Sequence, residues 1–60
     1  MSKKIAELRE QRGWTQTKLA ERLNVTRSHI NKIEKGKANA SIALLERIAK
    51  EFDVSIKDFF

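Results

Sequence analysis

The sequence contains no cysteine, no proline and only two glycines among its 60 residues. Without cysteine it can form neither a disulfide framework nor a thiolate zinc site, and this fits a reducing compartment. The longest apolar run, Ile42–Leu45, is far shorter than the ~18 residues of a membrane-spanning helix. It is also shorter than the ~7 residues of a signal-peptide core. We therefore expect one domain over residues 1–60, because so short a chain cannot bury two cores. The absence of cysteine and of a long apolar run leads us to expect that it lies in the cytoplasm.

The residues that build catalytic and metal sites are also scarce. Apolar residues make up 40% of the chain and are needed for the core, which leaves little for a deep substrate pocket. The one histidine, His29, cannot bind a metal alone. Ser28 and His29 are adjacent, so in a helix they point ~100° apart and do not form a nucleophile and base pair. We predict no enzyme activity, no metal and no cofactor.

Charge is abundant but uneven along the chain. The net charge is +5, yet residues 1–37 carry ten basic and four acidic side chains, which is +6. Residues 38–60 carry three basic and four acidic side chains, which is −1. Such asymmetry within one small domain indicates a basic face of the kind that binds polyanions. An unevenly charged solubilising surface is the alternative.

Helix start and stop signals divide the chain into short helices. Apolar residues frame four hydroxyl side chains in a hydrophobic-staple pattern, and we predict N-caps at Thr15, Thr26, Ser41 and Ser55. Gly13, Asn24 and Gly36 each follow a helix-favouring stretch, where a residue with left-handed backbone can end a helix. No segment alternates at period two long enough to form a strand. We predict an all-α fold with five helices at about 2–12, 16–23, 27–35, 42–52 and from 56 to the end.

The helices at 16–23 and 27–35 are joined only by Asn24–Thr26, as in a helix-turn-helix. In the second of these helices, Ile30 and Ile33 define the buried side. The outward side then holds Ser28, Asn31, Lys32 and Lys35, with Arg27 and His29 at its margins. Arginine and lysine match the acceptors of guanine in the major groove, and asparagine matches adenine. An ordinary solvated helix face remains the alternative.

Gly13–Ala20 and Val25–Lys37 resemble the Cro/lambda-repressor-like (Xre-type) helix-turn-helix family. The resemblance extends through Leu44–Ala49 to Val54–Phe60 without gaps, so it covers almost the whole chain. It implies a compact five-helix domain that places the helix at 27–35 in the major groove of double-stranded DNA. It also implies a sequence-specific transcriptional regulator, prokaryotic or phage-encoded, that acts as a repressor.

The resemblance carries residue roles with it. The implied base-reading residues are Arg27, Ser28, Asn31 and Lys32. The implied phosphate contacts are Thr15, Gln16, Thr26, His29, Lys35 and Lys37. Arg9 and Glu34 match a structural ion pair of the family, whereas two separately solvated charges are the plainer interpretation.

Two aromatic residues, Phe59 and Phe60, end the sequence. One ring can close the core while the other, beside Ile56, is exposed and suits a twofold contact. The family resemblance implies a homodimer on a palindromic operator, and we expect Ile56, Phe59 and Phe60 at its interface. A dimerising extension outside this chain is the alternative. An antitoxin or adaptor that uses the same fold to bind a protein remains a rival function.

Overall fold

Four α-helices and one short 3-10 helix form residues 2–59, which are the residues that the computed structural model describes and which contain no strand. The elements are α1 (Ser2–Gln11), α2 (Gln16–Leu23), α3 (Arg27–Glu34), α4 (Ile42–Glu51) and η1 (Ile56–Phe59). The all-α prediction is confirmed, and α1, α3 and α4 end one residue earlier than predicted, a usual uncertainty at helix ends. The predicted fifth helix is a 3-10 turn of four residues, because so short a segment cannot offset the entropy of starting an α-helix.

The predicted N-caps are confirmed by hydrogen bonds to the first turns of α2, α3, α4 and η1. The hydroxyls of Thr15, Thr26 and Ser41 accept from the backbone N–H groups three residues on, at 3.0, 3.1 and 3.1 Å. In η1, the Ser55 hydroxyl accepts from the backbone N–H of Lys57 at 3.2 Å, and the backbone N–H of Ser55 donates to the Asp58 carboxylate at 3.3 Å. These contacts satisfy backbone donors that have no partner within the helix, so each helix begins where the sequence predicts.

The helices end through residues with left-handed backbone, as the stop signals predict. Gly13, Asn24 and Gly36 have φ values of 70°, 58° and 74°. Asp53, which the sequence signals did not indicate, also has a positive φ of 54° just after α4. An aspartate tolerates this conformation better than most residues.

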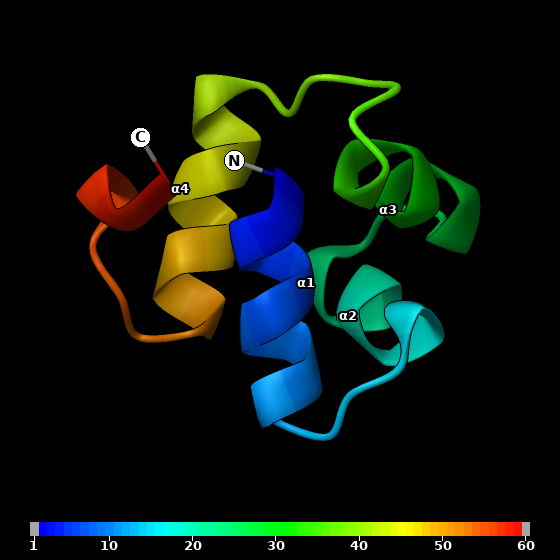
Figure 1. The fold of residues 1–60 in the computed structure, drawn as a ribbon, viewed down its shortest axis with the longest axis horizontal. Helices are drawn as coiled ribbons and strands as arrows, with labels where there is room; N and C mark the ends of the chain where they lie inside the picture. The colour runs from blue at the N-terminus through cyan, green and yellow to red at the C-terminus, as the bar shows by residue number, and fades with distance from the viewer. Residues whose placement is uncertain (1, 60) are drawn as a thin grey trace.

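Packing places α1 in the middle of the molecule, with α2 and α3 on one side and α4 and η1 on the other (Figure 1). One cluster of buried side chains joins all five elements, and it includes Ile30 and Ile33, the predicted buried side of α3. It consists of Ile5, Leu19, Ala20, Leu23, Ile30, Ile33, Leu44, Leu45, Ile48, Ala49, Phe52 and Phe59. Leu8 and Ile56 are partly buried and pack against it.

The turn between α2 and α3 is fixed by two further contacts. The backbone N–H of Val25 donates to the carbonyl of Ala20 at 3.0 Å, which closes the end of α2. From α4, the guanidinium of Arg47 donates to the carbonyl of Leu23, the last residue of α2. A cation at this helix end is favoured by the helix dipole. The helix pair is therefore tied to the rest of the domain while α3 stays at its outer edge.

Candidate nucleic-acid interface

The outer face of α3 carries the predicted base-reading side chains. Ile30 and Ile33 are 0% and 3% exposed, so the opposite face of α3 is directed outward. Arg27, Ser28 and Lys32 are exposed, and Asn31 is half-buried. The outer face of α3 thus presents hydrogen-bond donors, and the major groove is wide enough to admit an α-helix.

The predicted phosphate-contacting residues lie around the two ends of α3 and the start of α2. Thr15, Thr26, Lys35 and Lys37 are exposed, whereas Gln16 and His29 are half-buried. After α3, the backbone N–H groups of Lys37 and Ala38 both donate to the carbonyl of Lys32, at 2.8 and 3.2 Å. This double contact holds the segment with Lys37 close to the end of α3. Thr26 at one end of α3 and Lys35 and Lys37 at the other therefore flank its exposed face.

Arg9 of α1 and Glu34 of α3 form an ion pair beneath this surface. Two hydrogen bonds join them, from Arg9 Nε to Glu34 Oε2 at 2.8 Å and from Nη2 to Oε1 at 3.2 Å. Their side chains are 14% and 6% exposed. The hydrogen bond with Glu34 raises the pKa of Arg9 above its ordinary value, against a smaller opposing effect of burial. The pair therefore anchors the end of α3 to α1.

Gln16 links this ion pair to α3 in a way that the sequence analysis missed. Its Nε2 donates to Glu34 Oε1 at 3.0 Å, and its Oε1 accepts from Asn31 Nδ2 at 3.2 Å. The structure thus brings together a predicted phosphate contact and a predicted base reader. The signal in the sequence is the spacing of Asn31 and Glu34, since residues three apart share one helix face.

A second missed cluster surrounds Trp14, away from α3. Its ring packs on Phe52 with 5.3 Å between ring centroids, and the guanidiniums of Arg12 and Arg22 lie 5.7 and 5.0 Å from its centroid. Arg22 also forms an ion pair with Glu51. Trp14 is partly buried and packs against the core. The flanking arginines join the ends of α1, α2 and α4.

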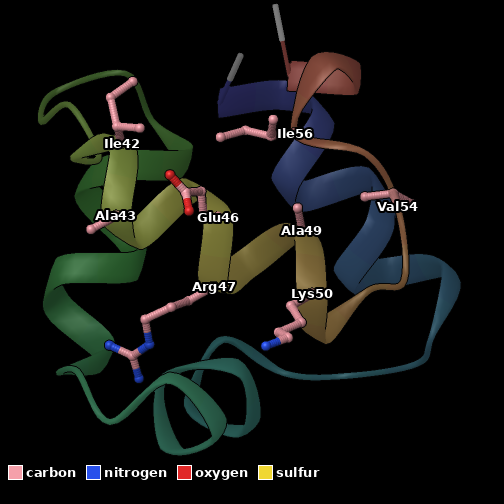
Figure 2. A pocket seen from close by; sticks show the side chains of 8 residues that line it. All are labelled: Ile42, Ala43, Glu46, Arg47, Ala49, Lys50, Val54 and Ile56. Carbon is pink, nitrogen blue, oxygen red and sulfur yellow. The ribbon is translucent and has the colours of Figure 1, made fainter.

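The predicted dimer residues have different surroundings. Phe59 is 3% exposed, so its ring closes the core of this chain and offers little surface to a second copy. Ile56 is half-buried, and Phe60 lies outside the described residues. Ile56 borders an open groove whose other lining residues are Ile42, Ala43, Glu46, Arg47, Ala49, Lys50 and Val54 (Figure 2). At the groove, Ile42 is 59% exposed.

Across residues 2–59, no three His, Cys, Asp or Glu side chains come together as a metal site would require. Within the same range, every helix is too short or too polar to cross a membrane.

Known proteins are similar to this chain in both sequence and fold. The chain is 42% identical over 60 residues to an uncharacterised HTH-type transcriptional regulator of Archaeoglobus fulgidus, covering 100% of this chain and 86% of that one. It is 40% identical over 53 residues to the competence pilus inhibition repressor of Acinetobacter baylyi, covering 88% of this chain. The chain spans 48% of the length of that repressor.

A solved structure gives the same fold. The crystal structure of SinR, a master regulator for biofilm formation, in complex with DNA superposes with a TM-score of 0.85. The sequence identity is 32%, with 93% of this chain and 90% of that chain covered. The model of the helix-turn-helix family matches residues 5–59. The chain therefore belongs to the helix-turn-helix family, and the Cro/lambda-repressor-like (Xre-type) resemblance of its motifs is confirmed.

Proposed function

We propose that this chain is a sequence-specific, double-stranded-DNA-binding transcriptional repressor that inserts α3 into the major groove of an operator. The observation that carries the proposal is the outer face of α3, where Arg27, Ser28 and Lys32 are exposed beside Asn31. Family membership and relatives named as transcriptional regulators support a DNA-binding regulator without enzyme activity. Its relatives in bacteria and archaea favour a prokaryotic or phage-encoded regulator that acts in the cytoplasm.

Two groups of side chains divide the work at the DNA. Arg27, Ser28, Asn31 and Lys32 read base edges, because their donors and acceptors match those of the major groove. Contacts to phosphate come from Thr15, Gln16, Thr26, His29, Lys35 and Lys37. The phosphate contacts supply most of the affinity and set the register, whereas the base contacts supply specificity.

A homodimer on a palindromic operator completes the proposal. One α3 contacts few base pairs, so two copies are needed for strong specificity. The groove beside Ile56 offers an apolar surface around Ile42, with Glu46 and Lys50 on its lining. Two copies related by a twofold axis can pair these opposite charges around the apolar centre. Ile56 is the predicted interface residue that the groove includes.

Selection of bound sites from random duplex DNA tests the function. We expect a palindromic consensus whose half-sites are about one helical turn, ~34 Å, apart. Such a consensus requires both base reading and a twofold dimer. Recovery of no enriched sequence would contradict DNA recognition by α3.

Sedimentation equilibrium of the Ile42→Glu variant tests the dimer surface. Ile42 is exposed and is the first residue of α4, where the helix dipole stabilises a carboxylate. We therefore expect the variant to fold. We expect a weaker dimer and an intact circular dichroism spectrum, with Lys37→Ala as a control that dimerises normally. An unchanged dimer constant would remove this groove from the interface.

The same groove favours the rival function of an antitoxin or adaptor-type protein-interaction module. An exposed Ile42 beside Ile56 suits a partner protein as well as a second copy. The two functions differ in the selection experiment. The protein-interaction function predicts that no consensus sequence is selected and that substitutions on the outer face of α3 leave its function unchanged.

A further inference from the structure

We propose that Glu34 is a positioning residue for base recognition, acting through Gln16 to hold the amide of Asn31 in the orientation that reads adenine. The inference rests on the proposed function, because it assigns a base preference to α3. Glu34 itself is 6% exposed in its side chain and is directed at Arg9 and Gln16. It therefore has no route of its own to a base edge.

The Glu34 carboxylate fixes the first step of the hydrogen-bonded chain. Paired with the Arg9 guanidinium, a carboxylate only accepts hydrogen bonds. Its Oε2 accepts from Arg9 Nε at 2.8 Å, and its Oε1 accepts from Arg9 Nη2 at 3.2 Å and Gln16 Nε2 at 3.0 Å. The amide of Gln16 must therefore present its NH₂ group to Glu34.

The orientation of the Gln16 amide determines the orientation of the Asn31 amide. With its NH₂ group facing Glu34, Gln16 directs its carbonyl Oε1 at Asn31, whose Nδ2 donates to it at 3.2 Å. If the Asn31 amide were turned over, two carbonyl oxygens would face each other with no proton between them. The orientation of both amides thus follows from the acceptor chemistry of Glu34, although nitrogen and oxygen have similar shapes.

What remains of the Asn31 amide matches adenine. Its Oδ1 and the second N–H of Nδ2 have no hydrogen-bond partner among residues 2–59. Adenine presents the N6 donor and the N7 acceptor in the major groove, which pair with a carbonyl and an N–H of one amide. Guanine presents two acceptors, O6 and N7, so Oδ1 would meet an acceptor. Turning the amide over would still place Oδ1 against one of these acceptors and would also break the contact with Gln16.

A phosphate contact alone would give Gln16 a different signature. Loss of a phosphate contact weakens binding to every sequence by the same factor. Loss of the positioning role instead changes the ratio of affinities for two bases at one position. The ratio therefore separates the two roles even if Gln16 has both.

The experiment measures this ratio on duplexes selected by the wild-type chain, with each A·T pair replaced in turn by G·C. Asn31→Ala identifies the position that Asn31 reads. We expect the wild type to prefer adenine there by about 5- to 150-fold, the scale of one bidentate contact. Gln16→Met keeps the Arg9 and Glu34 ion pair and should lower that preference about fivefold or more. Glu34→Gln, which can present either end of its amide to Gln16, should lower it as well.

Lys37→Ala is the matched control, because it should weaken binding to both duplexes and leave the ratio unchanged. An unchanged ratio in Gln16→Met, with equal loss on both duplexes, would overturn the proposal. NMR of the DNA-free protein gives an independent measurement that also detects unfolding. The side-chain amide resonances of Asn31 should shift in Gln16→Met and in Glu34→Gln, whereas unchanged resonances would overturn the proposal.

Failure of the proposed DNA-binding function and failure of the positioning role of Glu34 give different results. If the wild type selects no DNA sequence, the proposed function fails and the adenine assignment fails with it. The amide resonances still respond to Gln16→Met in that case, which would locate the failure in DNA recognition. If a consensus is found but the ratio does not change, only the positioning role of Glu34 fails.

Discussion

Arg9 and Glu34, 25 positions apart in the chain, form an ion pair with two hydrogen bonds that joins the end of α1 to the end of α3. A third bond runs from Arg9 Nη1 to the carbonyl of Trp14 at 2.8 Å, which also holds the loop before α2. One guanidinium therefore connects three segments of the domain. Both elements of the helix-turn-helix depend on it for their position.

Removing the Arg9 charge should destabilise the fold. Arg9→Met leaves the Glu34 carboxylate, 6% exposed, without its cation. We expect the free energy of unfolding to fall by about 3 kcal/mol, measured by urea unfolding. The double variant Arg9→Met/Glu34→Met should lose less than the two single variants together, because it leaves no unpaired charge. Additive losses would show that the pair contributes nothing beyond its separate side chains.

The contribution of Arg9 to stability should not vary with pH near neutrality. The hydrogen bond with Glu34 raises the pKa of Arg9 above its ordinary value. A raised pKa gives stability that is fully present below the unfolded-state value and is lost only as the pH rises through the folded-state value. The difference in unfolding free energy between wild type and Arg9→Met should therefore be equal at about pH 6 and pH 9. A difference that shrinks toward pH 9 would contradict the assignment.

The Trp14 cluster should stabilise the domain to a smaller extent. Arg22→Met removes the cation 5.0 Å from the Trp14 ring and the ion pair with Glu51. We expect a loss of about 1 kcal/mol and a change in the fluorescence of Trp14, the one tryptophan of the chain. Arg27→Met, on the outer face of α3, is the control and should change neither. Identical fluorescence in Arg22→Met would mean that the cation does not contact the ring in solution.

Replacing Gly13 should destabilise the domain only through its left-handed backbone conformation. Its φ is 70°, and a methyl group added there would meet no atom within 4 Å. Gly13→Ala should therefore cost about 1–2 kcal/mol from the left-handed backbone alone, measured as a lower Tm. Asn24, with a φ of 58°, is the counterpart, because Asn24→Gly relieves the same strain. A Gly13→Ala variant as stable as the wild type would show that this turn takes another conformation.

The sequence predicted those parts of the structure that depend on local chemistry. Caps such as Thr15 and Thr26 and the stop at Gly13 follow from hydrogen bonding and backbone sterics within a few residues. The buried side of α3 follows from the spacing of Ile30 and Ile33. These features need no knowledge of the tertiary fold.

Contacts between distant residues could not be predicted in the same way. The bond between Gln16 and Asn31 depends on the angle at which α2 and α3 cross, and no local pattern encodes that angle. The cations around Trp14 likewise come from two segments, the turn after α1 and the helix α2. The buried position of Phe59 depends on how η1 folds back onto the core.

Operator affinity should depend steeply on salt concentration. If each half-site engages about four phosphates, the slope of log affinity against log salt for the dimer should be about −7, at ~0.9 per phosphate. Lys37→Ala should reduce the magnitude of the slope by about one per half-site, because one phosphate contact is lost in each copy. Affinity that hardly changes with salt would exclude phosphate neutralisation as the main source of binding.

Base reading by α3 is tested most directly by the affinities of Arg27→Ala and Lys37→Ala for the selected operator and for duplexes with single base-pair changes. Arg27→Ala should lose about 1–3 kcal/mol on the operator and accept other bases at one position of each half-site. Lys37→Ala should weaken binding to all duplexes by the same factor. Equal losses on every duplex for both variants would contradict the account, because α3 would then contact DNA without reading its sequence.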